Sequence, residues 1–333
     1  MPRKIAIALV VIGISIAASS QTKWYRFSKG FIKSHYGTGS AIGALEANAS
    51  APAKAVHRIE CGGNDGELHI GVEASSILQE GDGSDSISGP ADGSEEFGVV
   101  AEPPNVSPAA NTQIQNISGK PVRFAGYFRV WNEGHDAGPV YPSNPHHVLE
   151  VHPVWGLRSG NVNLPTRGSR VFPMKGYAGY GASKFKPLLT GLPHTRWLKV
   201  AEDGDYVYVQ LLKADNFYQL PIIPRQINQI PGGIAVLADV FSDQAHQNLV
   251  YRNLTIVTAR GSRASRQLQV NSPSFMLGFF SVNLSSAMRI AEGHEGQANA
   301  VFAPAALEFF AFGFPREHAV RSSACDPDAE PDD

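Results

Sequence analysis

The chain has 333 residues, of which 43% are hydrophobic and 17% are charged, and its formal net charge is −2. This length is enough for about two domains, each with a core of its own. The near balance of charge excludes the strongly basic domain that is typical of general nucleic-acid binding. The charge is uneven, however: residues 118–230 hold thirteen basic and seven acidic residues, so a local basic face remains open there.

The first residues have the pattern of an export signal. The basic start MPRK precedes the apolar run IAIALVVIGISIA and the small residues ASSQ. The apolar run is short for a membrane-spanning helix, and the small residues suit a signal-peptidase site. We therefore predict a signal peptide over residues 1–20 and a periplasmic or extracellular protein, with an uncleaved anchor as the alternative. No later segment is apolar enough to span a membrane.

Two cysteines, Cys61 and Cys325, bear on the redox state of the chain. In an oxidising compartment an even pair can form a disulfide. The two residues lie far apart in sequence and Cys325 falls in a polar tail, so two separate thiols are the alternative to a Cys61–Cys325 bridge.

The first part of the chain predicts three strands and a helix. Residues 21–55 are rich in Gly, Ala and Ser and predict a linker. Apolar stretches flank a Gly-Asn-Asp-Gly turn in residues 56–74 and predict a hairpin, and residues 97–104 predict a third strand. Ser107 and Pro108 are typical of the cap and first turn of a short helix.

Two more strands follow this helix. Residues 121–131 alternate apolar and polar side chains, and the motif NPHHVLEVHPVW at 144–155 predicts a strand that ends at Pro153 and Gly156. Five strands with a helix between the third and the fourth is the order of an OB-type barrel. We therefore predict a mainly β protein with an OB-like five-stranded barrel at residues 56–160.

The second half of the chain continues the strand pattern. It predicts a hairpin, two further strands, a strand that runs into a helix, and a final apolar strand, at residues 196–214, 232–243, 248–261, 272–293 and 306–315. These elements predict a second β-rich domain, a sandwich or a barrel, at residues 161–320. The acidic tail at residues 321–333 predicts disorder.

The motif at 144–155 holds three histidines and a glutamate, and strand geometry divides them. Alternate residues of a strand share a face, so Glu150 and His152 lie on one face while His147 lies on the other with the apolar residues. His146 shares the face of Glu150 but lies roughly 13 Å away along a straight strand. The expected polar set is therefore Glu150 with His152.

Three interpretations of this set remain open. Imidazoles and a carboxylate are typical ligands of a catalytic zinc, so His135, Glu150 and His152 are candidate metal ligands. A carboxylate beside an imidazole also suits acid–base catalysis by Glu150 and His152. The third interpretation is structural: Glu150 pairs with Arg123 or Arg129, and the orientation expected for Arg129 favours a polar patch of Arg129, Glu150 and His152.

A second candidate surface comes from aromatic residues. Tyr206 and Tyr208 alternate on one strand and share a face, which would suit a platform for sugars or bases, with packing inside a hairpin as the alternative. We take Tyr206, Tyr208 and Arg129 as candidate ligand-binding residues.

The segment GKPVRFAGYFRVWNEGHD, followed by HHVLEVHPV, resembles a set of exported bacterial OB-like proteins. The last strand of these proteins reads (Trp/Leu)-Glu-(Ile/Val)-His-Pro-Val. The matching positions here are Gly119, Val122, Gly126, His135, Glu150, His152 and Pro153, and the match covers about a third of the chain. The resemblance implies an OB-like fold and export, and it implies no activity.

These observations favour a binding protein over an enzyme. OB folds commonly bind oligosaccharides or oligonucleotides, so we expect an exported ligand-binding or interaction module whose ligand is an oligosaccharide or another small molecule, with nucleic acid less favoured. The alternatives are a metal-dependent or acid–base hydrolase centred on Glu150 and His152, and a structural protein of the cell envelope. No organic cofactor is predicted, and a divalent metal ion belongs to the hydrolase alternative.

Overall fold

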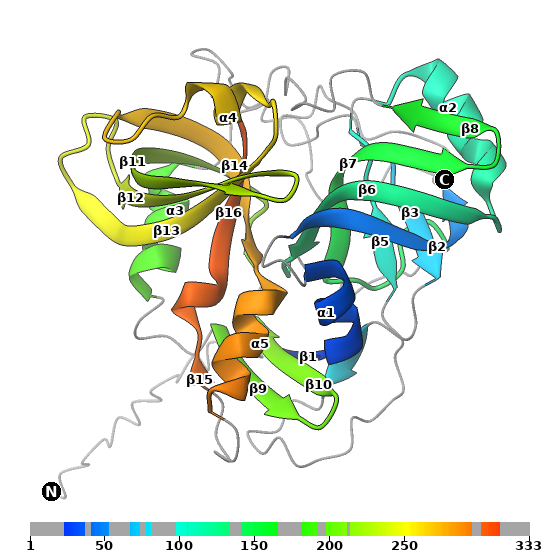
Figure 1. Ribbon diagram of the computed structural model, residues 1–333, viewed down its shortest axis with the longest axis horizontal. Helices are drawn as coiled ribbons and strands as arrows, with labels where there is room; N and C mark the ends of the chain where they lie inside the picture. Colours follow the sequence, from blue (N-terminus) through cyan, green and yellow to red (C-terminus); the bar gives the residue numbers. More distant parts are fainter. Residues whose placement is uncertain are drawn as a thin grey trace, which may run out of the picture.

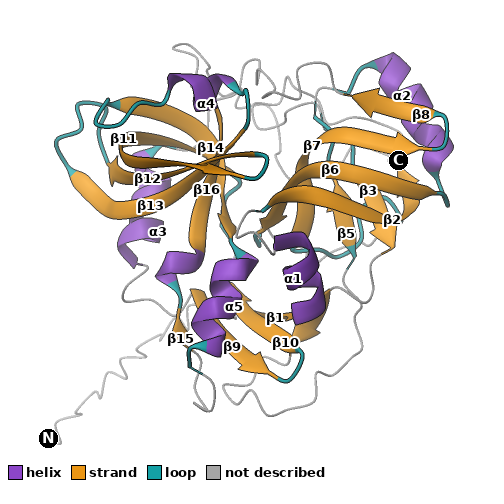
Figure 2. Cartoon of the chain, viewed as in Figure 1, coloured by secondary structure: helices purple, strands orange, loops and turns teal. Residues whose placement is uncertain are grey.

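The computed structural model describes residues 23–36, 41–52, 67–73, 78–81, 98–104, 106–132, 141–165, 181–191, 198–211, 214–294 and 301–313. The protein is mainly β, with two barrel domains side by side and a smaller sheet, covered by α1 and α5, below them in the view of Figure 1. Figure 2 shows that strands dominate both barrels and that the helices are short. The described residues contain no helix with the length and apolar character needed to cross a membrane.

The N-terminal barrel has the topology of an OB fold. Its strands are β2 (Ile42–Pro52), β3 (Ile70–Glu73), β5 (Val99–Ala101), β6 (Pro121–Val130) and β7 (Leu149–Ser159). They pair in the order β5-β3-β2-β6-β7, and the parallel pairing of β5 with β7 closes the barrel. The helix α2 (Pro108–Ile114) lies between the third and fourth strands, and β8 (Val162–Pro165) extends the edge at β7. The predicted OB-like barrel is confirmed.

The first strand of this barrel lies where a linker was predicted. Residues 23–28, 29–36 and 42–52 form β1, α1 and β2, so the linker prediction for 21–55 is wrong over these residues. The small residues of β2 concealed its alternation, in which Leu45 and Ala49 are buried in the barrel. The barrel therefore begins at residue 42 rather than 56, and the predicted turn near residue 64 lies outside the described residues.

Two local predictions have different outcomes. The short helix begins as predicted, because the Ser107 side chain accepts a hydrogen bond from the backbone N–H of Ala110 and Pro108 follows it. The strand β7, in contrast, does not end at Pro153 but continues to Ser159. The register of β7 against β6 shifts between Gly126 and Phe128, and this irregularity accommodates a proline that has no N–H to donate.

The C-terminal barrel repeats the same strand connectivity. Its strands are β11 (Phe217–Ile230), β12 (Gly233–Phe241), β13 (Leu249–Ala259), β14 (Ser274–Val282) and β16 (Leu307–Gly313). They form a closed barrel in the order β11-β12-β13-β16-β14, with β13 and β16 parallel. The helix α4 (Arg263–Gln267) again lies between the third and fourth strands, and α5 (Leu284–Glu292) follows the fourth. Of the two predicted architectures, the barrel is the one that forms.

The third sheet joins distant parts of the sequence. Its order is β15 (Val301–Phe302), β9 (Leu198–Asp203), β10 (Tyr206–Leu211), β1 (Lys23–Ser28) and β4 (Leu78–Gly81). The predicted hairpin of β9 and β10 is present and turns at Gly204, but it pairs with β1 instead of joining the C-terminal barrel. Residues 198–211 of the predicted 161–320 domain therefore belong to a different sheet from the C-terminal barrel. α1 (Lys29–Tyr36) packs against α5, which covers β9 and β10, and α3 (Ala182–Gly191) packs on the C-terminal barrel.

The two barrels are in direct contact along β6 and β14. The backbone N–H of Val130 donates to the Ser281 hydroxyl at 3.0 Å. The Tyr127 ring lies against Phe279 and Phe310, with ring centroids 5.8 and 4.3 Å away. Because the C-terminal barrel covers this part of β6 and β7, the side chains of Arg129, Glu150 and His152 are buried rather than solvated.

Candidate metal centre

Seven ionisable side chains are buried where the N-terminal barrel faces the C-terminal barrel, and each residue is at most 7% exposed: Glu67, His69, Glu102, Arg129, His147, Glu150 and His152. Such residue types are rarely buried unless they are paired or bind a metal. We call this set the Glu–His cluster. It brings together the ends of two loops, the end of β5, and the outward faces of β6 and β7.

Backbone hydrogen bonds place the members of the cluster beside one another. Glu102 follows β5, and its N–H and carbonyl bond to Val151 and Val154 of β7, which sets it next to His152. The N–H of Leu68 donates to the carbonyl of Pro103, so the segment that carries Glu67 and His69 lies along the segment that carries Glu102. The cluster is therefore fixed by strand pairing, not by long flexible side chains.

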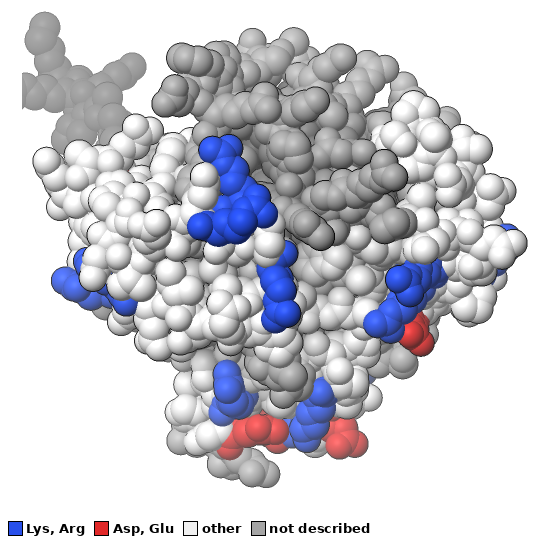
Figure 3. All heavy atoms as spheres, turned by 45° about the horizontal axis from the view of Figure 1, so that its top comes forward, with Lys and Arg blue, Asp and Glu red and all other residues white. Residues whose placement is uncertain are grey.

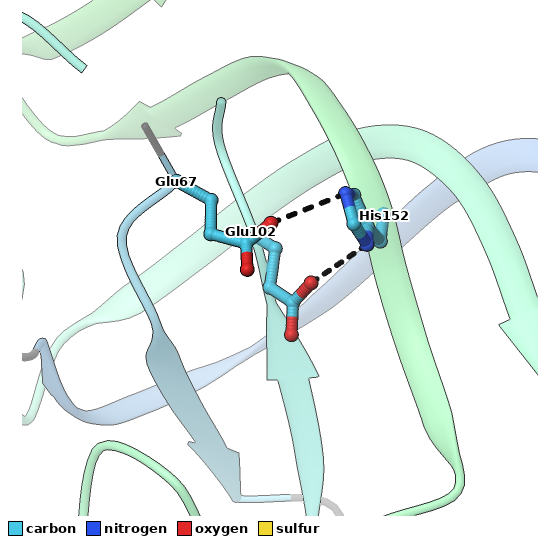
Figure 4. A group of neighbouring side chains, drawn as sticks. All are labelled: Glu67, Glu102 and His152. Carbon is cyan, nitrogen blue, oxygen red and sulfur yellow. Dashed lines mark ion pairs between the residues drawn. The ribbon is translucent and has the colours of Figure 1, made fainter. Parts of the chain in front are cut away.

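His152 stands between two carboxylates (Figure 4). Its Nδ1 lies 2.7 Å from Glu102 Oε2, and its Nε2 lies 3.4 Å from Glu67 Oε2. The imidazole ring packs against phenylalanines of the C-terminal barrel, with centroids 5.1 Å from Phe279 and 6.1 Å from Phe217. These contacts hold the ring with one nitrogen toward each carboxylate.

His69 lies near the other oxygen of each of the same two carboxylates. Its Nε2 lies 3.5 Å from Glu102 Oε1 and 3.7 Å from Glu67 Oε1. Two imidazoles and two carboxylates thus alternate in a closed ring.

Glu150 forms the second half of the cluster. Its Oε2 lies 3.2 Å from Arg129 Nη1, and its Oε1 lies 3.5 Å from His147 Nε2. Burial by itself would raise the pKa of the Glu150 carboxyl, but the Arg129 guanidinium and the contacts with His147 and His152 outweigh burial and hold the pKa well below its usual range. Glu150 is therefore ionised at neutral pH.

The pKa of the Glu102 carboxyl is shifted in the opposite direction from that of Glu150. Burial, followed by the negative charge of Glu150, raises the pKa of Glu102 to about 8. Without a cation, Glu102 therefore carries a proton at neutral pH.

The tautomer of His147 follows from its neighbour. His147 Nδ1 lies 2.8 Å from the carbonyl oxygen of Pro145. A carbonyl only accepts hydrogen bonds, so Nδ1 carries a hydrogen and Nε2 is the ring atom that faces Glu150. This is the arrangement by which proteins orient metal-binding histidines.

Two groups within the cluster have the spacing of a metal site. They are Glu67 with Glu102 and His152, and Glu102 with His147 and Glu150. In each group one ligand atom from every residue lies within 4.8 Å of the others. Glu102 belongs to both groups.

The sequence identified part of this cluster. Arg129, Glu150 and His152 meet as the strand pattern predicted. His147 was wrongly set aside, because it precedes β7 and the alternation of a strand does not apply to it. The sequence did not point to Glu67, His69 and Glu102. The segment Glu-Leu-His, which places a carboxylate and an imidazole directly ahead of an apolar run, is the pattern that could have indicated two of them.

The other candidate residues lie elsewhere. Arg123 pairs with Glu46 at the surface, with Arg123 Nη1 2.7 Å from Glu46 Oε1. Tyr206 and Tyr208 are in the third sheet, where Arg26 lies 4.4 Å from the centroid of the Tyr206 ring and Tyr208 is only 9% exposed. His146 is in neither metal-spaced group. His135, Cys61 and Cys325 lie outside the described residues.

A second buried carboxyl lies at the same interface between the barrels. Glu308 accepts hydrogen bonds from the Tyr127 hydroxyl at 2.5 Å and from the Asn283 amide at 2.9 Å. Burial raises the pKa of Glu308 to about 7, although both hydrogen bonds lower it. This carboxyl contacts no member of the Glu–His cluster in any described interaction.

Basic side chains of the described residues are dispersed over one face of the molecule. On the face drawn in Figure 3, the described Lys and Arg residues form several separate groups. Nucleic-acid binding proteins usually carry a continuous basic patch or stripe. The described residues of this face offer none.

Comparisons with known proteins give no family. No family model and no curated protein matches the chain. Among solved structures, a chain described as "Structure of murine DNA binding protein bound with ds DNA" shares 10% identity and covers 82% of this chain and 100% of its own length. Its TM-score of 0.18 is too low to indicate a common fold, so it carries no argument about function.

Proposed function

We propose that the protein binds a divalent transition-metal ion in its N-terminal OB-like barrel, through Glu67, Glu102 and His152. The observation that carries the proposal is the 3.4 Å separation of His152 Nε2 from Glu67 Oε2 between two buried side chains. The proposal keeps the predicted class, a ligand-binding module built on an OB-like barrel, and assigns a metal ion as the ligand.

Most of the distances between imidazoles and carboxylates in the cluster are longer than hydrogen bonds. An N–H···O hydrogen bond spans about 2.7–3.2 Å. Five separations between imidazole nitrogens and carboxylate oxygens in the cluster are 3.4, 3.5, 3.5, 3.6 and 3.7 Å, whereas His152 Nδ1 lies 2.7 Å from Glu102 Oε2, within hydrogen-bonding range. A tetrahedral ion with bonds of about 2.0–2.2 Å places its ligand atoms roughly 3.4 Å apart. The side chains therefore stand close to the separation that a shared ion requires.

The charge of the cluster also favours one cation. With neutral histidines, Arg129 offsets only one of the three buried carboxylates Glu67, Glu102 and Glu150. An uncompensated buried charge costs several kcal/mol. One divalent ion would balance the remaining two negative charges and would replace the proton that Glu102 otherwise holds.

The donor types define the class of metal. Imidazole nitrogen with carboxylate oxygen suits zinc, manganese and ferrous iron, whereas calcium and magnesium prefer oxygen alone. A set of three protein ligands also leaves a position open, as in catalytic zinc sites. That feature supports a metal-dependent hydrolase as the second candidate function, with Glu67, Glu102 and His152 rather than Glu150 holding the ion.

The test is metal binding by the purified full chain. After removal of metals with a chelator, Zn²⁺ and Mn²⁺ are titrated by calorimetry and bound metal is counted by mass spectrometry. We expect at least one equivalent in the wild type and loss of the tightest equivalent in Glu67→Gln. The matched control is His246→Asn, which alters a histidine of the C-terminal barrel that contacts Phe241 and the Ser274 carbonyl. A folded wild-type protein that binds neither ion would overturn the proposal.

A further inference from the structure

We infer that the cluster is a dinuclear site, in which a second divalent ion binds at Glu102, His147 and Glu150 and the Glu102 carboxylate bridges the two ions. This inference rests on the proposed function. It adds a second binding site and assigns to Glu102 the role of a shared ligand.

The first support is the position of Glu102 between the two groups. Its ligand atoms lie within 4.8 Å of Glu67 and His152 on one side and of His147 and Glu150 on the other. Its Oε2 lies 2.7 Å from His152 Nδ1, and the same nitrogen lies 3.6 Å from Glu150 Oε2, so Glu102 stands where the two groups meet. A carboxylate can bind one ion through each of its two oxygens, and ions in dinuclear sites stand about 3.5–4 Å apart.

The second support is the orientation of His147. Its Nδ1 hydrogen is directed at the Pro145 carbonyl, and Nε2, the ring atom that would bind a metal, lies 3.5 Å from Glu150 Oε1. The carboxylate of Glu150 supplies Oε1 as a second ligand atom. An imidazole nitrogen and a carboxylate oxygen at this distance are arranged so that both can bind one cation. Arg129 occupies the other oxygen of Glu150, Oε2, and therefore leaves Oε1 for such an ion.

The charges predict the order of binding. One divalent ion makes the buried cluster neutral, because three carboxylates then face one ion and Arg129. A second ion adds two positive charges to a site of low polarity. The second equivalent is therefore expected to bind at least about tenfold more weakly than the first, which corresponds to about 1.4 kcal/mol.

One substitution removes a ligand of the second ion and leaves the ligands of the first ion unchanged. The amide of His147→Asn can still donate to the Pro145 carbonyl, but it has no counterpart of Nε2 to bind a metal. Titration with Zn²⁺ is expected to show two equivalents in the wild type and in the control His246→Asn, and only the tighter one in His147→Asn. His246 has a φ of 55°, a conformation that asparagine adopts readily, so this control is not expected to disturb the fold.

Adjacency of the ions is tested with Mn²⁺. Two carboxylate-bridged Mn²⁺ ions give an exchange-coupled EPR spectrum, whereas isolated ions do not. The coupled signal is expected in the loaded wild type and is expected to disappear in His147→Asn. Two equivalents that persist in His147→Asn, or that never show coupling, would overturn the dinuclear site. A single equivalent in the wild type would overturn this inference and leave the proposed function standing, and no equivalent at all would overturn both.

Discussion

Arg129 and Glu150 face each other across the ladder of β6 and β7, with Arg129 Nη1 3.2 Å from Glu150 Oε2 and neither residue more than 3% exposed. The same guanidinium donates through Nε to the Phe280 carbonyl of the C-terminal barrel and lies 4.2 Å from the centroid of the Phe279 ring. One side chain therefore neutralises part of the Glu–His cluster and also joins the two barrels.

Removal of Arg129 is expected to be strongly destabilising. Arg129→Met keeps much of the apolar stem but leaves the Glu150 carboxylate buried without its guanidinium. Breaking a buried ion pair in this way typically costs about 3–5 kcal/mol. We expect a loss of that size in the free energy of unfolding of the metal-free protein, measured by urea denaturation followed by fluorescence.

The double variant Arg129→Met with Glu150→Gln tests the cause. If the unpaired charge of Glu150 causes the loss in the free energy of unfolding, the second substitution recovers part of that loss, because it replaces the buried carboxylate with an uncharged amide. Equal stability of the single and double variants would show that Arg129 acts through its contacts with the C-terminal barrel alone. The conservative variant Arg129→Lys retains the charge and is expected to lose less than Arg129→Met.

The buried carboxyl of Glu308 predicts a pH dependence of stability. Its pKa rises from 4.5 in the unfolded chain to about 7 in the folded protein, so the folded state binds the proton more tightly. The stabilising contribution is fully present below the lower pKa and is lost as the pH rises through 7. The shift corresponds to about 3 kcal/mol, since each pKa unit is worth about 1.4 kcal/mol.

The variant Glu308→Gln isolates this contribution. Its amide can accept from Asn283 and donate to the hydroxyl oxygen of Tyr127, so both contacts can be retained. Tyr36 and Tyr127 face Glu308 but stay neutral in this range, because burial and the charge of Glu308 raise their pKa values well above the usual one. Between pH 5 and pH 8, we expect the metal-free wild type to lose about 2.5 kcal/mol more stability than the variant. Parallel profiles would contradict the prediction.

The contact of Gly232 with Ile42 predicts a steric link between the barrels. Gly232 lies at the β11–β12 turn with a φ of 76°, and a Cβ at this position would stand 2.2 Å from Cγ2 of Ile42 in β2. Gly232→Ala is therefore expected to lower stability both by backbone strain and by the clash, by about 2 kcal/mol or more. Adding Ile42→Ala removes the 2.2 Å contact and leaves only the Cβ of residue 42 at 3.2 Å, but it does not remove the strain, so a partial recovery in thermal denaturation is expected.

The sequence was sufficient where a local pattern decides the structure. Ser107 and Pro108 marked the start of α2, and the alternation of residues 121–131 marked β6. The same parity argument placed Arg129 beside Glu150 from the sequence alone. In each case the neighbours that fix the element lie a few residues away or on the adjacent strand.

The sequence was insufficient where distant segments meet. Glu67, Glu102 and His152 come from three separate segments, and only closure of the barrel by the parallel pairing of β5 with β7 brings them together. β1 pairs with β10, whose residues are more than 170 positions further along the chain, so no window of sequence could reveal the third sheet. Burial of the cluster also depends on contact with the C-terminal barrel. This contact between the barrels produces no periodic pattern in the sequence.

Metal binding by the Glu–His cluster predicts a gain in stability that depends on ion concentration. A ligand that binds only the folded state stabilises it by about 2.7 kcal/mol at a concentration 100 times its dissociation constant. We therefore expect Zn²⁺ to raise the melting temperature of the chelator-treated wild type and of His246→Asn. Glu67→Gln is expected to gain little, because it retains two of the three ligands but lacks one of the two negative charges that the ion balances. Arg129→Met, whose cluster lacks the guanidinium that competes with a cation for Glu150, is expected to gain more than the wild type. An equal gain in all four proteins would place the ion outside the cluster, because the substitutions change its charge and donors in opposite directions.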